Sequence, residues 1–542
     1  AMTAYGTLTG LPIFPPEWVF EPWAGGGGGR WRNGPLQDIA LEQMAAMKKF
    51  HELDIPHSGF YAEGAGATFY GEYKKEELYK VVSFGERHGF KVFSWQFPNM
   101  TQELAQELLP ECPKEELPIT RNKNDEEEKL PVYIDFSHPR AKELLAAQWK
   151  DRMDAGIRGS MVDFGDVVPD EAVFYDGRRG DEMHNAYAYQ YAKNYRELFE
   201  QKYGDDHVLY TRGAAPGSQH FACQFGGDQL TSFQGLKYAI AGGLSAAASG
   251  LPFWGVDAGG YDGFPDQETY LRWTEYAAFC PLMRFHGTEP REPWEYDAFT
   301  VKVYRYYAWL RENLRPYIVS VAAEAHKLGI PMMRPLAMIY PEDQEATKVW
   351  DEYLFGEDLL VAPVSDETEE RKIYFPEGRW ISLWNLNDEI SGPVQRSVEV
   401  PIDKIPVYIR EGSFLPLRLN ESLKLGESMS ESETEMILAV VPQNDSIVKE
   451  TLYERSGAKT CCGMEKNGET IQLQISGRTA ELYVMLAGIH WKNTEAIVNG
   501  RTLTKVTARE GLYFTEGYLE LEEGILVKIN PSAESVIKIQ KK

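Results

Sequence analysis

Residues 159–169 read Gly159-Ser-Met-Val-Asp163-Phe-Gly-Asp166-Val-Val-Pro169. A short apolar run ends in a carboxylate, and a glycine, a second acid and a proline follow closely. This pattern is typical of a buried strand that ends in an acid at the rim of a pocket and then turns away. A similar place follows at Gln224-Phe-Gly-Gly-Asp228-Gln229. We therefore expect Asp163 and Asp228 to share one pocket.

The first part of the chain alternates strand-like runs with amphipathic helical patterns. Between residues 11 and about 320, the expected strands are Trp18–Trp23, Ser58–Ala62, Lys91–Trp95, Gly159–Asp163, Val208–Arg212, Ala222–Phe225, Pro252–Asp257 and Leu282–His286. Helical patterns separate most of them, for example Asp38–Leu53, Lys75–His88, Arg140–Ala155 and Asn185–Tyr203. Eight such units predict an α/β fold, a (β/α)8 TIM barrel, over residues 1–335. In such barrels the working residues follow the carboxyl ends of the strands, where Asp163 and Asp228 fall.

The pattern changes from about residue 345. Short alternating strands separated by turn signals are expected at Leu359–Pro363, Arg371–Phe375, Pro406–Ile409, Met436–Val441, Ile471–Ile475, Glu481–Leu486 and Leu519–Ile529. Such a series predicts one or two C-terminal β-sandwich domains. We place a proximal β-sandwich at residues 336–420 and a distal β-domain at residues 421–542.

Composition narrows the possible partners and compartments. The 542 residues are 43% hydrophobic, which indicates a globular chain, and the net charge of −26 argues against a nucleic-acid partner. No stretch of 18 or more apolar residues occurs, so we expect no membrane partner. The five cysteines are an odd number and include no Cys-x-x-Cys pair, which favours a reducing compartment. The first residues, Ala1-Met2-Thr3, do not resemble a leader peptide. We therefore expect a cytoplasmic location. A homo-oligomer is left open.

Five consecutive glycines, Gly25–Gly29, lie between Trp23 and Trp31. Glycine weakens both helices and strands, so we expect this run to form a loop after the first strand, or a lid over the pocket. The run lacks the Lys-Ser or Lys-Thr that would complete a phosphate-binding loop. The ten histidines are scattered without metal-ligand spacing, so neither a metal nor a cofactor is expected.

Five motifs resemble those of glycoside hydrolase family 31, which contains retaining α-glucosidases, α-xylosidases, α-galactosidases and sulfoquinovosidases. They are Val162-Asp163-Phe-Gly-Asp166, Tyr210-Thr-Arg212-Gly, Gly226-Gly-Asp228-Gln229, Phe253-Trp254-Gly-Val-Asp257 and Met283-Arg284-Phe-His286-Gly287. The resemblance extends over residues 10–420. It implies a retaining, exo-acting α-glycoside hydrolase that works by double displacement and needs no cofactor.

In that family resemblance, Asp163 is the nucleophile that forms a glycosyl-enzyme and Asp228 is the acid/base. Retention needs two carboxyl groups about 5 Å apart, in environments that keep one ionised and the other protonated. The expected partner is a small-molecule or oligosaccharide α-glycoside, with an α-glucoside as the default. The same scaffold also fits an α-galactosidase, an α-xylosidase or an α-glycosyltransferase. A different class, a catalytically inactive carbohydrate-binding barrel, is the rival hypothesis.

Six residues are expected to bind the substrate, and most of them also have a purely structural alternative. They are Arg212, His286, Asp257, Trp254, Phe225 and Glu63. Arg212 could instead belong to a buried ion pair, Asp257 could orient Arg212, and the two aromatic side chains could be core residues. Glu63 stands near the position where the family has a first-subsite aspartate.

Three departures from the family pattern bear on the substrate. The chain begins almost at the barrel, whereas members usually begin with an N-terminal β-sandwich, so we expect that domain to be missing or supplied elsewhere. Met161 replaces the lysine that α-xylosidases carry two residues before the nucleophile, and the Lys-Arg-x-x-Trp run of sulfoquinovosidases is not visible. The identity of the sugar therefore stays open.

Overall fold

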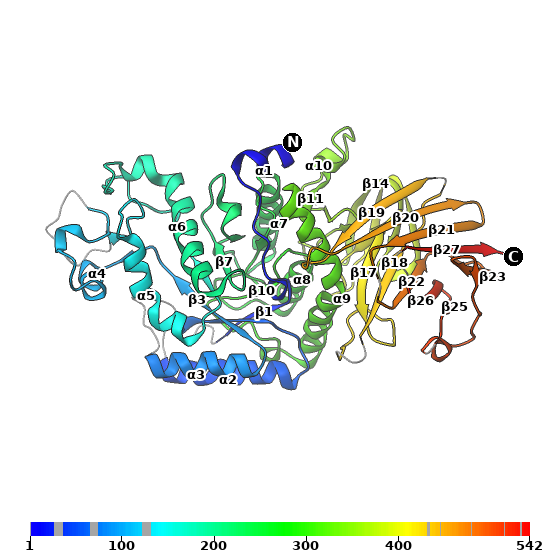
Figure 1. The fold of residues 1–542 in the computed structure, drawn as a ribbon, viewed down its shortest axis with the longest axis horizontal. Coiled ribbons are helices and arrows are strands. Elements are labelled where there is room, and N and C mark those ends of the chain that lie inside the picture. Colours follow the sequence, from blue (N-terminus) through cyan, green and yellow to red (C-terminus); the bar gives the residue numbers. More distant parts are fainter. Residues whose placement is uncertain are drawn as a thin grey trace. The chain divides into compact units, whose positions relative to one another are not determined.

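The computed structural model describes residues 2–26, 36–65, 74–121, 132–430, 434–444, 446–478, 480–513, 515–531 and 534–542, without the side chains of Gly26, residues 36–38 and Glu63 (Figure 1). The described part divides into two units. The first contains residues up to 304 together with 326–331, and the second contains residues 305–325 and 332–542.

The first unit is built on an eight-stranded parallel sheet. In order around the sheet, its strands are β10 (Arg284–Phe285), β1 (Trp23–Gly26), β2 (Gly59–Ala62), β3 (Lys91–Gln96), β6 (Gly159–Val162), β7 (Val208–Thr211), β8 (Cys223–Phe225) and β9 (Trp254–Gly255). A parallel bridge between Gly255 and Leu282 joins the last strand to the residues directly before the first. The ring is therefore nearly closed, which confirms the predicted TIM barrel.

Helices follow most of these strands. They are α2 (Leu36–Glu52), α3 (Lys75–Arg87), α5 (Ala141–Ala155), α6 (Gly180–Tyr203), α7 (Phe233–Ala248), α8 (Gln267–Ala278) and α9 (Ala298–Leu328). Side chains cap α7 and α8: Ser232 accepts a hydrogen bond from the backbone N–H of Gly235, and Asp266 accepts one from Thr269. Such caps stabilise the first helical turn by about 1 kcal/mol each. The capped first turns of α7 and α8 follow the two loops that carry Asp228 and Asp257.

Shorter elements lie outside the barrel strands. They are α1 (Met2–Thr9), α4 (Gln102–Leu108) and the two-stranded pair β4 (Asn99–Met100) and β5 (Val132–Tyr133).

The predicted strand Trp18–Trp23 is wrong. Glu17–Phe20 forms a 3-10 turn whose Val19 and Phe20 are buried, and β1 begins only at Trp23. An apolar run can be buried in a turn as well as in a strand, so its hydrophobicity could not distinguish the two structures.

Strand β1 includes the first two residues of the glycine run, Gly25 and Gly26, contrary to the expected loop. A Cβ on Gly25 would lie 2.7 Å from the carbonyl oxygen of Phe285, so a close backbone approach requires glycine there. Gly27–Gly29 lie outside the described residues.

The second unit contains β-sheets, as predicted. Its first sheet is antiparallel and has the order β11 (Met333–Pro335), β12 (Tyr353–Phe355), β13 (Leu359–Val361), β16 (Val407–Arg410), β14 (Glu370–Ser382), β15 (Asn385–Glu399), with the short helix α10 (Leu336–Ile339) after β11. Leu354, Ile373, Phe375 and Trp380 belong to its buried core.

Two further sheets form a β-sandwich. One has the order β17 (Phe414–Leu419), β18 (Glu435–Val440), β22 (Leu482–Ala487), β26 (Gly524–Ile529), β25 (Gly517–Glu520). The other has the order β19 (Ile447–Tyr453), β20 (Lys459–Asn467), β21 (Thr470–Ser476), β27 (Glu534–Lys541), β23 (Thr494–Val498), β24 (Arg501–Thr502). Side chains of both sheets, such as Val484 and Leu473, share one core. The predicted single strand Leu519–Ile529 is wrong, because a turn in which the N–H of Leu521 donates to Gly524 divides it into β25 and β26.

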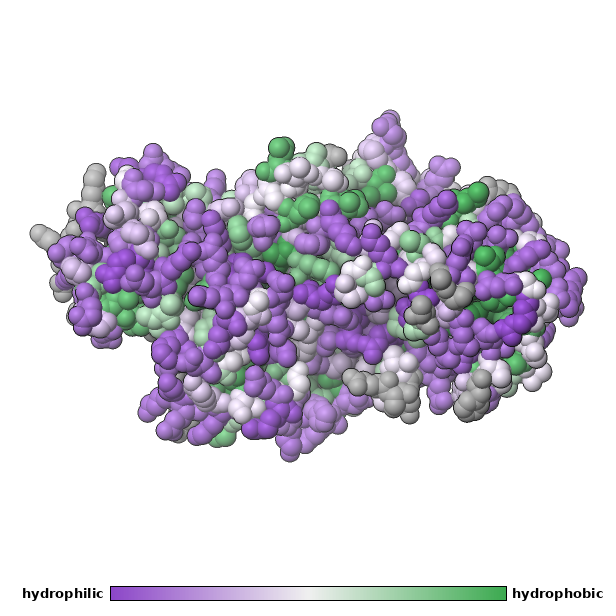
Figure 2. All heavy atoms as spheres, in the orientation of Figure 1, coloured by the Kyte–Doolittle hydropathy of each residue, from purple (hydrophilic) through white to green (hydrophobic). Residues whose placement is uncertain are grey.

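Hydrophilic residues cover much of the molecular face in Figure 2. Among the described helices, none is both long and apolar enough to cross a membrane.

Candidate active site

The candidate residues follow the carboxyl ends of neighbouring parallel strands. Asp163 comes directly after β6, Arg212 after β7, Asp228 after β8, Asp257 after β9 and His286 after β10. Because the strands are parallel, all these ends lie at one rim of the barrel. The topology thus brings together residues that are far apart in the sequence.

Asp163 is buried and held from two sides. Its Oδ2 accepts a hydrogen bond from Trp95 Nε1 at 3.0 Å, and its Oδ1 accepts one from the backbone N–H of Phe164 at 2.9 Å. Phe164 has a φ of 57°, a left-handed conformation that bulky residues rarely adopt. The strained turn and the two hydrogen bonds fix the direction of the carboxylate.

One guanidinium contacts both acids. Arg212 Nε lies 3.2 Å from Asp163 Oδ1, and Arg212 Nη1 lies 3.5 Å from Asp228 Oδ2. The guanidinium also stacks on Phe164, 4.1 Å from the ring centre. A Cβ on Gly227 would lie 2.9 Å from Arg212 Cδ, so the glycine before Asp228 leaves space for this arginine. Asp163 and Asp228 therefore border the same site.

The two acids have different environments. The side chain of Asp163 is 6% exposed, whereas that of Asp228 is 50% exposed. Burial raises the pKa of Asp163, and the charge of Arg212 and the hydrogen bonds from Trp95 and Phe164 oppose that rise. Distinct environments are what allow two carboxyl groups to take different roles at one pH.

Asp257 forms a buried ion pair with Arg284, at 2.7 Å between Oδ1 and Nη1, and both side chains are almost fully buried. The Arg284 guanidinium lies over the rings of Tyr210 and Phe225, at 4.8 and 5.1 Å from their centres. Burial raises the pKa of Asp257, and Arg284 opposes that rise. The ion-pair partner of Asp257 is thus Arg284, where the sequence had suggested Arg212.

Gln229 joins the two loops that carry Asp228 and Asp257. Its side-chain Oε1 accepts a hydrogen bond from the N–H of Asp257 at 3.3 Å, and its carbonyl accepts one from the N–H of Tyr261 at 2.8 Å. Arg291, which is 2% exposed, donates to the carbonyl groups of Gly260 at 2.7 Å and Gly263 at 2.6 Å. The loops after β8, β9 and β10 are therefore cross-linked by hydrogen bonds.

His286 is buried between two tyrosine rings, with Tyr61 at 4.5 Å and Tyr261 at 5.5 Å between ring centres. Burial holds the pKa of His286 well below its ordinary value, so the imidazole is neutral near pH 7. A neutral imidazole can donate one hydrogen bond and accept another, which suits a sugar hydroxyl.

The remaining predicted binding residues differ in accessibility. Phe225 is 2% exposed and packs beside Tyr210, with 5.7 Å between ring centres, so its packing fits the core alternative. Trp254 is half-buried on β9, beside the glycine turn that precedes Asp228. Glu63 directly follows β2, and its side chain lies outside the described residues.

Sequence reasoning did not assign roles to Trp95, Gln229, Arg284 and Arg291. Gln229 and Arg284 stand inside motifs that were already recognised, so their positions carried a usable signal. Trp95 and Arg291 act through contacts that only the folded chain reveals.

Among the described residues there is no group of three or more His, Cys, Asp or Glu side chains that could hold a metal ion.

The sequence matches two domain families. Residues 13–321 match the glycosyl hydrolases family 31 TIM-barrel domain, and residues 329–415 match the glycosyl hydrolase family 31 C-terminal domain.

Characterised proteins with similar sequences belong to several activity classes. An isomaltosyltransferase of Sporosarcina globispora is 28% identical over 98% of this chain and 53% of its own length. An α-xylosidase of Saccharolobus solfataricus is 32% identical over 79% of this chain and 58% of its own length. A sulfoquinovosidase of Escherichia coli is 32% identical over 52% of this chain. The chain therefore spans little more than half the length of the first two relatives.

Solved structures share the fold. The cycloalternan-forming enzyme from Listeria monocytogenes, in complex with a pentasaccharide substrate, matches all of this chain and 56% of its own with a TM-score of 0.88 at 22% identity. A Flavobacterium johnsoniae dextranase complexed with glucose matches with a TM-score of 0.87 at 23% identity and 72% coverage of its own chain. The domain matches, which cover more than half of the sequence, show that the chain belongs to glycosyl hydrolase family 31.

Proposed function

We propose that this protein is a retaining, exo-acting α-glycoside hydrolase, with α-glucosides as the first substrates to test. Asp163 is the nucleophile and Asp228 the acid/base. The observation that carries the proposal is the contact of one guanidinium, that of Arg212, with both carboxylates. Family membership supports the reaction class.

The proposed reaction has two displacements. In the first, a carboxylate oxygen of Asp163 bonds to the anomeric carbon while Asp228 gives its proton to the leaving oxygen. In the second, Asp228 takes a proton from water, and the water oxygen displaces Asp163 from the anomeric carbon. Trp95, Phe164 and Arg212 contact the nucleophile and stabilise its ionised form. The more exposed Asp228 is suited to exchange protons with water.

Arg212 and His286 are proposed to bind sugar hydroxyl groups, with Trp254 as a wall of the sugar site. Asp257 is proposed to act mainly by holding Arg284, and Glu63 is retained as a candidate at the end of β2. We also propose a cytoplasmic location, which the odd number of cysteines supports.

Transfer to another sugar is the second candidate activity. In that reaction a carbohydrate hydroxyl replaces water in the second displacement and the first is unchanged. The similarity to an isomaltosyltransferase over 98% of this chain favours it. An α-galactoside or α-xyloside would be cleaved by the same acids.

The test is a panel of nitrophenyl α-glycosides, assayed with the wild type and with Asp163→Ala. Cleavage of at least one glycoside, lost in the variant, is expected. Undiminished activity in Asp163→Ala would remove Asp163 from the mechanism, and inactivity of the wild type on every sugar would favour a binding protein. Addition of a sugar acceptor distinguishes transfer, which yields a longer product, from hydrolysis.

A further inference from the structure

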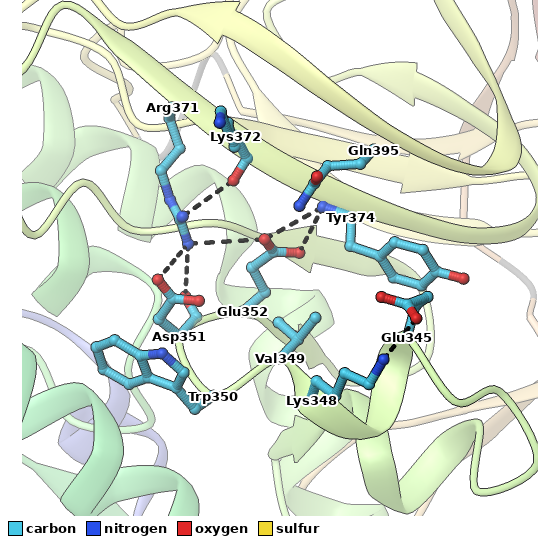
Figure 3. A pocket seen from close by; sticks show the side chains of 10 residues that line it. All are labelled: Glu345, Lys348, Val349, Trp350, Asp351, Glu352, Arg371, Lys372, Tyr374 and Gln395. Atoms are coloured by element: carbon cyan, nitrogen blue, oxygen red, sulfur yellow. Dashed lines mark hydrogen bonds and ion pairs between the residues drawn. The ribbon is translucent and has the colours of Figure 1, made fainter.

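A second pocket lies in the second unit, beside the sheet that follows the barrel. Its volume is about 360 Å³, at the small end of ligand-binding pockets. Figure 3 shows its lining, which comes from the segment before β12 and from strands β14 and β15. None of these residues belongs to the site at the barrel rim.

Trp350 is the aromatic component of this lining. Its side chain is 49% exposed, although tryptophan has a large apolar surface that folding normally covers. A half-exposed indole in a concave site offers a flat apolar face to a ligand. The C–H face of a sugar ring is a flat surface of that kind.

Polar planar groups form part of the remaining lining. Arg371 Nη2 lies 2.8 Å from Asp351 Oδ2 and 3.6 Å from Glu352 Oε1. Glu352 is 3% exposed, and its carboxyl oxygens accept from the backbone N–H of Tyr374 at 3.1 and 3.2 Å. Gln395 adds an exposed amide from β15. Carboxyl, guanidinium and amide groups can each contact two neighbouring hydroxyl groups.

The charges of the lining balance. Three basic residues, Lys348, Arg371 and Lys372, accompany three acidic residues, Glu345, Asp351 and Glu352. Arg371 is paired with Asp351, and Lys348 Nζ lies 2.6 Å from Glu345 Oε1. A phosphate or a free cation would favour a lining of one sign, whereas this lining suits a neutral polar ligand.

We propose that this pocket is a second, non-catalytic binding site for a neutral saccharide. The indole of Trp350 packs against a sugar ring, and Glu352, Arg371 and Gln395 hydrogen-bond its hydroxyl groups. Burial raises the pKa of Glu352, and the charge of Arg371 opposes that rise. The choice of α-glucans as probes and the use of Asp163→Ala to prevent turnover rest on the proposed function.

The test follows Trp350 directly by fluorine NMR. The full chain carrying Asp163→Ala, which prevents turnover, is labelled with 5-fluorotryptophan, and the signal of Trp350 is identified by its loss in Trp350→Phe. Isomaltotriose, maltotriose, xylotriose and inorganic phosphate are titrated separately. A saturable shift of the Trp350 signal with at least one trisaccharide, and none with phosphate, is expected.

Two further variants separate local binding from indirect effects. Gln395→Ala should raise the apparent dissociation constant by about threefold or more, since one hydrogen bond is lost. Ile447→Ala, which removes an exposed apolar side chain from β19, should leave the titration unchanged. A Trp350 signal that no trisaccharide moves, that only phosphate moves, or that responds equally in Gln395→Ala would overturn the proposal. Failure of the catalytic proposal would appear separately, as absent hydrolysis by the wild type.

Discussion

Arg212 Nε lies 3.2 Å from Oδ1 of Asp163, within reach of an ionised carboxylate that the barrel otherwise buries. The opposite charge favours the ionised form of the acid, which a nucleophile needs. Through its Nη1 the same side chain also approaches Asp228, so its removal would alter both acids at once.

Replacement of the nucleophile should abolish turnover while leaving the fold intact. Asp163→Asn keeps the shape of the side chain but cannot form the glycosyl-enzyme, so kcat should fall on the order of 10⁴-fold. Asp166→Asn is the control, because this neighbouring acid is 45% exposed and lies 3.9 Å from Arg212. Its kcat should change less than about tenfold. Equal losses in the two variants would contradict the assignment.

The hydrogen bond from Trp95 should set the acid limb of the pH profile. This bond stabilises ionised Asp163, so its loss in Trp95→Phe should raise the pKa of Asp163 further. Activity needs the ionised form, and the acid limb of kcat/KM should therefore move to higher pH.

Trp18→Phe controls for the loss of an indole N–H. Trp18 donates to Asp206 at an exposed position, and its variant should keep the wild-type profile. An acid limb that stays in place in Trp95→Phe, or moves to lower pH, would show that this bond does not tune the nucleophile.

Gly227 should be needed for the position of Arg212. Its φ is +75°, and an added Cβ would lie 2.9 Å from Arg212 Cδ, so Gly227→Ala combines backbone strain with a steric clash. Gly89→Ala has comparable strain, with a φ of +82°, but open space around the Cβ. Both variants should lose about 1 kcal/mol of stability, and only Gly227→Ala should lose kcat/KM, by roughly tenfold or more. Similar kinetics in both variants would contradict this role.

The buried pair of Asp257 and Arg284 should contribute strongly to stability. Asp257→Ala leaves the Arg284 charge buried without its partner, which costs about 3–5 kcal/mol of unfolding free energy. The exposed pair of Lys48 and Glu52 on α2 provides the comparison, and Glu52→Ala should cost about 0.5 kcal/mol or less. Thermal unfolding followed by calorimetry measures both. Equal costs would mean that Arg284 finds another partner.

Much of the barrel was predictable because parallel strands carry strong local signals. The runs ending near Asp163 and Arg212 are apolar, and each ends in a charged residue, so both the strand and the candidate site residue at its end are visible in the sequence. The first strand was misplaced, because the turn at Glu17–Phe20 buries the same apolar side chains as a strand would. Local hydrophobicity does not distinguish these structures.

Contacts between distant segments carried no such signal. Trp95, on β3, reaches Asp163 at the end of the neighbouring strand β6, and Arg291 holds carbonyl groups about thirty residues away in the chain. The pocket beside Trp350 likewise depends on how the segment before β12 packs against β14 and β15. No local hydrophobic periodicity or sequence motif indicates such long-range contacts, so only the folded structure shows them.

The most direct test of the central claim is to trap the glycosyl-enzyme. The 5-fluoroglycosyl fluoride of the sugar cleaved in the nitrophenyl panel forms the covalent intermediate but slows its release. Peptide mass spectrometry should then find one added fluorosugar on Asp163, with no labelling of Asp163→Ala. A label on another residue, or inactivation without any covalent label, would contradict Asp163 as the nucleophile of a retaining pair.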